Sequence, residues 1–356
     1  MSSKLNKIID QSQTKSETKV EKKAMNLPAS WYVAMPSKAL GKKPLAIELF
    51  GQHLVVWRDQ KGNPVIMERY CSHLGASLAI GKVVEGCIQC PFHHWRFDNS
   101  GHCVFIPEVD RIPPMARQVN YVTAERYGFI WVWYGSETPL FPLPMFSAAE
   151  DERDNYMPLR FANPAKTTVQ RVVENQYDYT HIPALHELNV TNSIQMTLLN
   201  DQSSVQQSEP PIKKEAWFGA VIEARIKKYF GPIGTVAQAL GINAETFTMQ
   251  VDGWPSGILF TVFVNGEERW RALKCTTPVA ENNTIEQVLI MVKKTGKFWL
   301  DILYYVIFGL QNRATSAQDV PVWNTMKSDG GRVFVKHDLT LLKFREFYQS
   351  WVDMAD

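Results

Sequence analysis

Two short Cys–His pairs constrain the fold of this chain more than any other feature of its sequence. The first pair is Cys71-Ser-His73, and the second, after sixteen intervening residues, is Cys90-Pro-Phe-His93. Two thiols and two imidazoles on paired loops can hold a metal centre. Pairs that bind one zinc ion usually have two to four residues between the ligands, whereas the first pair has one. The spacing therefore predicts a metal-binding domain and does not favour ordinary zinc.

A zinc knuckle remains the alternative for this region, because Cys87 and Cys90 also form a C-x-x-C pair. We prefer Cys71, His73, Cys90 and His93 as the ligands. Cys87 is then a small strand residue, and His94 is not a ligand, because His93 gives the two-residue gap after Cys90. Cys103 and Cys275 are interpreted as core residues, because free cysteine behaves as a small apolar side chain.

The sequences Cys71-Ser-His-Leu-Gly-Ala76 and Cys90-Pro-Phe-His-His-Trp95 together resemble the Rieske signature. In a Rieske [2Fe–2S] cluster, two Cys bind one iron and two His bind the other. By this resemblance the cluster ligands are Cys71, His73, Cys90 and His93. Respiratory Rieske subunits carry a disulfide-forming Cys at the positions of Ala76 and Phe92, so the resemblance favours the oxygenase and ferredoxin branch.

The composition excludes several classes of protein. The chain has 356 residues, 45% hydrophobic and 21% charged, which is ordinary for two to three globular domains. A net charge of +2 gives no reason to expect a nucleic-acid partner. No apolar run reaches the ~18 residues of a membrane span; the closest, residues 298–310, is interpreted as a core or pocket-lining helix. Clustered cysteines and the lack of an apolar N-terminal region predict a cytoplasmic protein.

Local composition predicts a polar tail and two domains. Residues 1–28 have few apolar side chains and are expected to be a mobile tail. Residues 29–145 have short apolar runs between turn residues, which predict an all-β domain, and the resemblance implies that it is the Rieske domain. Residues 146–356 predict an α+β domain with an antiparallel sheet, which the resemblance implies is the catalytic domain. Within it, strand-like runs occupy 216–230 and 256–294, and helical patterns occupy 167–180, 317–326 and 339–356.

A second possible metal site lies in the sequence Asp178-Tyr-Thr-His181-Ile-Pro-Ala-Leu-His186. Two His and one carboxylate form the facial triad of non-haem Fe(II) oxygenases. On a regular helix, His181 and His186 would lie roughly 140° apart, so we expect Pro183 to break the helix between them. Asp178 lies one turn before His181 and is predicted to orient that imidazole.

The carboxylate ligand is expected far downstream, and spacing alone leaves four candidates. These are Asp301, Asp319, Asp329 and Asp338. The D-x-x-H-x4-H arrangement resembles the iron motif of the Rieske non-haem iron oxygenases. The segment Gln318-Asp319-Val-Pro-Val-Trp323 resembles the terminal ligand helix of that family, which selects Asp319. The structural alternative for Asp319 is a charge near a helix N-terminus.

The family resemblance implies a complete electron path. Asp178 is expected to connect the iron to a Rieske histidine, by position His93, across the subunit boundary of a homotrimer. O2 is the co-substrate. No G-x-G-x-x-G fingerprint follows a strand, so NAD(P)H is expected to act only indirectly, through a separate ferredoxin or flavin reductase. The alternative is a Rieske electron carrier that retains a degenerate second domain.

Several segments resemble the members of the family that N-oxygenate aryl amines to nitro compounds. These include residues 29–35, 308–311 and 323–331, whereas residues 179–207 diverge. A small aromatic substrate is therefore expected. Hydroxylation or desaturation at C–H, or O- or N-dealkylation, of an aromatic or alicyclic substrate remains the alternative. The pocket is expected to use residues 194–199, 217–218 and 298–308, although these runs fit a core equally well and no single substrate residue is assigned.

Overall fold

The computed structural model describes residues 25–199, 212–228, 243–327 and 330–355, together with residues 235 and 239. Residues 1–24 of the predicted tail lie outside this range. The end of that tail is ordered, because Leu27 is buried and the Pro28 carbonyl accepts a hydrogen bond from the Tyr32 hydroxyl at 2.9 Å. The prediction of a mobile segment as far as residue 28 is therefore wrong for its last residues.

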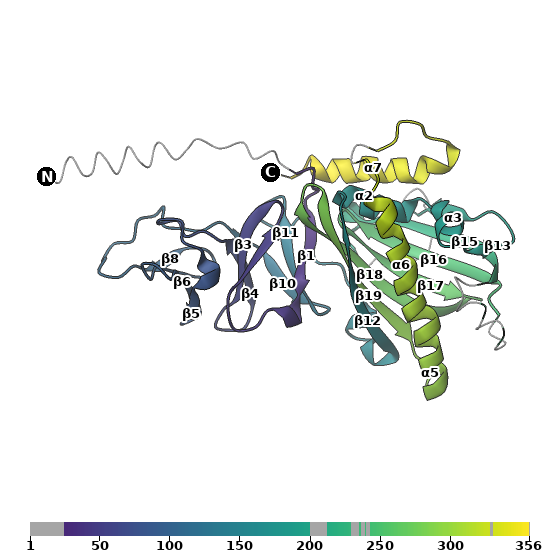
Figure 1. The fold of residues 1–356 in the computed structure, drawn as a ribbon, viewed down its shortest axis with the longest axis horizontal. Coiled ribbons are helices and arrows are strands. Elements are labelled where there is room, and N and C mark those ends of the chain that lie inside the picture. Colours follow the sequence, from purple (N-terminus) through teal and green to yellow (C-terminus); the bar gives the residue numbers. More distant parts are fainter. Residues whose placement is uncertain are drawn as a thin grey trace.

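The N-terminal part is all-β, as predicted, and consists of three small antiparallel sheets (Figure 1). The first has the order β1-β11-β10, the second β2-β3-β4-β9 and the third β5-β6-β7-β8. The strands are β1 (Ser30–Pro36), β2 (Leu45–Leu49), β3 (Gln52–Arg58), β4 (Pro64–Glu68), β5 (Lys82–Val84), β6 (Cys87–Gln89), β7 (Arg96–Phe97), β8 (Cys103–Phe105), β9 (Asn120–Tyr121), β10 (Thr123–Arg126) and β11 (Phe129–Tyr134).

A close backbone approach joins the third sheet to the segment that follows it. The Gln118 amide donates to the Gly101 carbonyl at 2.7 Å, and Gly101 has φ +83°. A Cβ atom at position 101 would lie 2.2 Å from the Gln118 carbonyl oxygen. Only glycine fits this crossing, which holds Gln118 next to the first Cys–His loop.

The C-terminal part is built on one antiparallel sheet of eight strands, with the order β12-β19-β18-β17-β16-β15-β13 and β14 also paired to β15. The strands are β12 (Tyr156–Ala165), β13 (Asn189–Val190), β14 (Gln195–Leu198), β15 (Phe218–Lys228), β16 (Thr246–Trp254), β17 (Gly257–Val264), β18 (Glu267–Ala280) and β19 (Asn283–Lys293). The edge strand β12 was not predicted, because Pro158 and Pro164 argue against a strand in the sequence pattern. Proline is tolerated there because one side of an edge strand has no ladder to donate to.

Helices cover this sheet and confirm the α+β prediction. In Figure 1, α5 and α6 cross one face of the sheet, and α7 runs along its end. The helices are α2 (Val169–Glu174), α3 (His181–Leu185), α5 (Phe298–Tyr304), the π-helix η7 (Tyr305–Leu310), α6 (Gln311–Trp323) and α7 (Leu339–Val352). The 3-10 turns are η1 (Ser37–Ala39), η2 (Leu78–Ile80), η3 (Ser147–Ala149), η4 (Arg153–Asn155), η5 (Asn175–Tyr177), η6 (Lys214–Ala216) and η8 (Lys336–Asp338).

The two parts share a continuous interface. The Phe50 amide donates to the Pro278 carbonyl at 2.7 Å, and the Thr277 hydroxyl donates to the Val33 carbonyl at 2.7 Å. The sheet β5–β8 nevertheless lies at one end of the elongated molecule, remote from α3 and α6 (Figure 1). No helix of the described residues is long and apolar enough to cross a membrane.

Candidate metal centres and active site

The two predicted Cys–His loops lie at the tip of the N-terminal part, and backbone hydrogen bonds close each of them. In the first, the Cys71 amide donates to the Ala76 carbonyl at 2.9 Å. In the second, the Cys90 amide donates to the Trp95 carbonyl at 2.8 Å, and His94 adopts φ +61°. The two loops therefore reverse direction tightly and place the paired side chains opposite each other.

The side chains of Cys71, His73, Cys90 and His93, the Cys–His quartet, fit a metal centre. The rings of His73 and His93 have centroids 4.7 Å apart, and both thiols are buried. The Nδ1 atom of His93 is buried and has no hydrogen-bond partner among the described residues. Buried polar atoms are normally paired, so this nitrogen is well suited to bind a metal. Burial, with the nearby Cys90 thiol, raises the pKa of Cys71 to about 12, so metal binding there would release protons.

Gln118 fixes the first loop and was missed in the sequence. Its side-chain oxygen accepts from the Ser72 amide at 2.8 Å. Its side-chain nitrogen donates to the Glu68 carbonyl at 3.1 Å and to the Tyr70 carbonyl at 2.8 Å. Both polar atoms of its side chain thus hold the loop and the strand end before it, but a single Gln far along the chain carries no local signal for this role.

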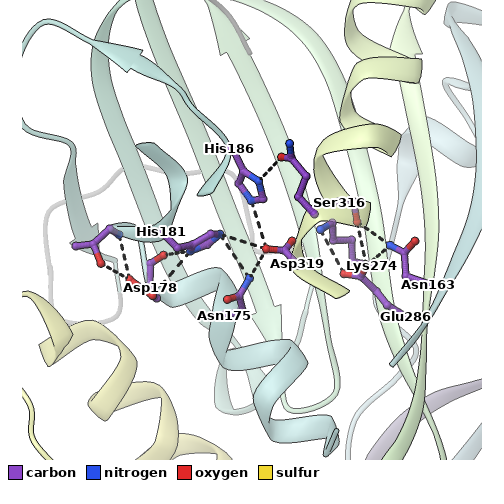
Figure 2. Close-up of polar contacts among 11 residues, drawn as sticks. Asn163, Asn175, Asp178, His181, His186, Lys274, Glu286, Ser316 and Asp319 are labelled. Carbon is purple, nitrogen blue, oxygen red and sulfur yellow. Dashed lines mark hydrogen bonds and ion pairs between the residues drawn. The ribbon is translucent and has the colours of Figure 1, made fainter. Parts of the chain in front are cut away.

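The second group consists of His181, His186 and Asp319, which the structure brings together in the C-terminal part (Figure 2). Asp319 Oδ1 lies 3.4 Å from His186 Nε2 and 4.0 Å from His181 Nε2. His181 begins α3, His186 follows its last residue, and Asp319 comes from α6. Two imidazoles and one carboxylate that converge in this way can hold one metal ion with open coordination positions.

The Nδ1 atom of each imidazole already has a hydrogen-bond acceptor, so Nε2 is the atom that can face a metal. His186 Nδ1 lies 3.0 Å from Gln318 Oε1, and His181 Nδ1 contacts the backbone carbonyl of Asp178. Both partners are acceptors, so each Nδ1 carries the proton, and Nε2 is the nitrogen of each ring that can bind a metal. The donor set therefore fits an iron ion.

Two local expectations for this segment are wrong. Pro183 lies inside α3, in its first turn, where its missing N–H costs nothing. The chain breaks instead at Asp178, which has φ −95° and ψ 87°. Asp178 therefore does not share a helix face with His181. It contacts the imidazole through its backbone carbonyl, while its carboxylate Oδ2 lies 4.0 Å from Nδ1.

Of the other three carboxylates considered as the iron ligand, two accept local hydrogen bonds and one lies outside the described residues. Asp301 accepts hydrogen bonds from the Thr295 amide and hydroxyl, both at 2.6 Å. Asp338 accepts from the Val335 amide at 2.7 Å. Asp329 lies outside the described residues. Asp319 is also not at a helix N-terminus. The sequence predicted a helix that begins at residue 317, but α6 begins at Gln311.

Asn175 is a further polar neighbour that sequence analysis did not identify. Its side-chain nitrogen lies 3.4 Å from Asp319 Oδ1 and 3.5 Å from His181 Nε2. Burial tends to raise the pKa of Asp319, but His186, Lys274 and His181 outweigh it, so that this pKa lies below its ordinary value. Burial also lowers the pKa of His181. Both shifts favour the charged carboxylate and neutral imidazole that bind a metal.

A pocket adjoins this group. Its wall is mostly apolar and comes from the edge strand β12 and the strands β16 to β19: Phe161, Phe247, Met249, Phe260, Trp270, Ala272, Val288 and Ile290. The polar wall residues beside the three candidate ligands are Gln176, Lys274, Asn312, Thr315 and Ser316. The expectation that residues 194–199, 217–218 and 298–308 line it is wrong. Phe298 and Trp299 are exposed, and residues 194–197 line a different hollow.

Comparison with known proteins agrees with both centres. The Rieske [2Fe-2S] domain family model matches residues 30–118. Aminopyrrolnitrin oxygenase PrnD of Pseudomonas fluorescens is 45% identical over 334 residues, which cover 92% of each chain. The oxygenase component of 3-ketosteroid-9-alpha-monooxygenase of Rhodococcus rhodochrous is 24% identical and covers 88% of this chain and 80% of its own. The crystal structure of dicamba monooxygenase bound to dicamba has a TM-score of 0.67 at 18% identity, covering 93% of this chain and 98% of its own.

The chain therefore belongs to the Rieske non-haem iron oxygenase family. It is an oxygenase whose cofactors are a Rieske [2Fe–2S] cluster and a mononuclear iron, with O2 as co-substrate. A Rieske oxygenase of this fold takes its electrons from a separate donor. The alternatives of a zinc knuckle and of an electron carrier without catalysis are not supported.

Proposed function

We propose that this oxygenase N-oxygenates an aryl amine, in successive steps, to a nitro compound. The observation that carries the proposal is its 45% identity, over 92% of both chains, to a protein named aminopyrrolnitrin oxygenase. The mostly apolar pocket beside the His–His–Asp group supports it, because such a wall suits an aromatic ring.

The residue roles follow from the sequence motifs and are supported by the geometry. Residues 29–145 form the Rieske domain, where Cys71, His73, Cys90 and His93 hold the cluster. Residues 146–356 form the catalytic domain, where His181, His186 and Asp319 hold the iron. The buried and unpaired Nδ1 of His93 and the engaged Nδ1 atoms of His181 and His186 support these roles.

The iron, when bound, supplies the activation of O2. In the first step one oxygen atom enters an N–H bond of the amine and gives a hydroxylamine. The other oxygen atom leaves as water, with two electrons from the donor and two protons. The protein orients the amine nitrogen toward the iron ligands, and the wall of apolar residues holds the ring and excludes water.

Asp178 is the proposed electron-transfer residue, and it acts between protomers of a homotrimer. The remote positions of the β5–β8 tip and α3 in one chain support an inter-subunit path (Figure 1). The Asp178 side chain is 33% exposed and can meet His93 of a neighbouring protomer. A head-to-tail interface of this kind closes into a ring.

The electron donor is a ferredoxin or a flavin reductase, which draws on NAD(P)H. None of the five cysteines forms a disulfide, which supports a cytoplasmic protein.

Turnover of an aryl-amine panel tests the proposed function. Holoenzyme with a generic reductase, NADH and O2 is expected to give hydroxylamino, nitroso or nitro products, separated by chromatography and identified by mass. Oxidation at carbon of methyl, methoxy or alicyclic substrates, without any N-oxidised product from the amines, would overturn it. Oxidation at carbon is the second candidate function, because the chain is 24% identical to a steroid monooxygenase component.

A further inference from the structure

A buried ion pair lies in the wall of the substrate pocket. Lys274 Nζ is 3.3 Å from Glu286 Oε1, and their side chains are 16% and 2% exposed. Lys274 lines the pocket, together with His181, His186 and Asp319. Figure 2 shows the pair beside Asp319, between the sheet and α6.

The sheet register explains why these residues meet. Glu286 of β19 is opposite Asn163 of β12, and Lys274 of β18 is opposite Val288 of β19. Opposite residues of antiparallel strands present their side chains on the same face. Glu286 and Val288, two apart on β19, also share that face. The polar residues therefore form one end of the same surface that carries the apolar pocket wall.

The carboxylate of Glu286 is held in place from three directions. Besides Lys274, Oε2 accepts from Asn163 Nδ2 at 2.9 Å and from the Ser316 hydroxyl at 3.1 Å. Ser316 lies three residues before Asp319 on α6, which places the two on one face of the helix. The orientation of the pair is thus tied to the helix that carries Asp319.

Lys274 has N–H donors to spare, whereas both carboxylate oxygens of Glu286 already accept from a partner. Among the described residues, Glu286 is the one hydrogen-bonding or ion-pair partner of the ammonium group, which also lies 5.7 Å from the Phe260 ring centroid. An ammonium group has three N–H donors. The remaining donors face the pocket, where the charge of Lys274 also helps to lower the pKa of Asp319. Because an apolar pair of similar volume is often as stable as a buried ion pair, stability alone gives no reason for charges here.

We propose that Lys274 is a specificity-determining residue that donates a hydrogen bond to a neutral acceptor group on the substrate ring, and that Glu286 is the positioning residue that holds it. Because Glu286 balances the charge of Lys274, this end of the pocket offers N–H donors without net positive charge. A carboxylate on the ring would have to lose its hydration without gaining a counter-ion. The inference rests on the proposed function only in taking aryl amines as probes.

Three ring compounds of similar shape test the inference by equilibrium binding. They are 4-aminoacetophenone with a neutral acceptor, 4-isopropylaniline without one, and 4-aminobenzoate with a negative charge. Dissociation constants are measured calorimetrically on the iron-loaded holoenzyme without O2, and the 3-substituted isomers are included because the acceptor position is open. The quantity compared between variants is the preference for the acetyl over the isopropyl compound.

Lys274→Met is expected to reduce this preference roughly tenfold, the effect of one hydrogen bond from a charged donor. Glu286→Gln is expected to act differently. It leaves Lys274 with an unbalanced charge, so 4-aminobenzoate should bind at least about fivefold more tightly than to the wild type. A merely structural role for the pair would not produce this gain. The matched control Lys293→Met removes a half-exposed lysine, paired with Glu268 at 3.8 Å, from outside the pocket and should change neither quantity.

An unchanged acetyl preference in Lys274→Met, no gain for 4-aminobenzoate in Glu286→Gln, or no binding of any probe to the wild type overturns the inference. The double variant Lys274→Met/Glu286→Gln removes both charges and is measured if the single lysine variant does not fold; it should also lose the acetyl preference. Turnover is assayed separately. A shifted binding preference with no N-oxidised product would refute the proposed function and leave the role of Lys274 standing.

Discussion

Nδ1 of His186 lies 3.0 Å from Oε1 of Gln318, the residue that precedes Asp319 on α6. This contact fixes the imidazole so that Nε2 faces Asp319. The helix therefore supplies both the carboxylate of the metal group and the acceptor that orients one of its imidazoles.

Replacing Gln318 by Leu removes this acceptor and should lower iron affinity roughly 10- to 100-fold, the usual cost of losing such a contact. Iron retention is measured by competition with a chelator, and the Rieske EPR signal should stay intact. Gln349→Leu is the control, because among the described residues the Gln349 side chain of α7 bonds the exposed Asp353 side chain alone. Equal iron retention in both variants would contradict the role of Gln318.

His93→Ala should abolish the Rieske visible absorbance and EPR signal, because it removes a proposed imidazole ligand of the cluster. The catalytic domain should still fold and bind iron. The neighbouring His94 provides the matched control. It adopts φ +61°, which Asn tolerates, so His94→Asn should retain the spectrum. A normal spectrum in His93→Ala would show that the ligand is another residue.

Asp178→Asn should retain both metal centres and lose turnover, by roughly 10- to 100-fold or more. The backbone carbonyl that contacts His181 remains in this variant, so iron should stay bound. Metal analysis and the Rieske spectrum are compared with the rate of product formation, with the exposed Asp353→Asn as control. Near-normal activity with full iron content would exclude Asp178 from the electron path.

Glu268 should stabilise the catalytic sheet at neutral pH. It accepts from the Tyr156 hydroxyl at 2.5 Å and pairs with Arg271 at 2.9 Å. Burial tends to raise the pKa of Glu268, but Arg271, Tyr156 and Lys293 together hold it below the usual 4.5. Loss of the charge in Glu268→Gln should cost about 2 kcal/mol, or roughly 4–8 °C in the unfolding midpoint.

The pH dependence of this effect follows from the depressed pKa. The stabilisation is fully present above the unfolded-state pKa and is lost as the pH falls through the lower folded-state value. The midpoints of wild type and Glu268→Gln, from thermal scans by circular dichroism, should therefore converge in acid. A difference that persists at low pH would show that charge is not the cause.

Local motifs were predictable, and contacts between distant segments were not. The pairs around Cys71 and Cys90 and the His181/His186 pair each lie within a few residues, so the sequence could show them as candidate ligands, and the Rieske motif upstream favoured a metal site for the second pair. Choosing Asp319 among four carboxylates needed the family resemblance, because a separate helix delivers it. Gln118 and Asn175 act on segments that only folding brings near, so no pattern marked them.

Sheet register explains the remaining failures. The pocket wall alternates along β12, β16, β17, β18 and β19, and which face of each strand meets α6 depends on pairing across the whole sheet. The sequence placed the pocket in apolar runs such as 298–308 instead. Similarly, Lys274 and Glu286 meet only through the pairing of β18 with β19, so neither residue stood out.

A single-turnover experiment with ¹⁸O2 tests the central claim most directly. Holoenzyme is reduced chemically, freed of reductant and mixed with 4-aminoacetophenone and ¹⁸O2, and the product is analysed by mass spectrometry. The two-centre N-oxygenase account predicts one ¹⁸O atom on the amine nitrogen, with the Rieske cluster oxidised in the same turnover. An unlabelled product, a label on carbon, or a cluster that stays reduced while product forms would contradict it.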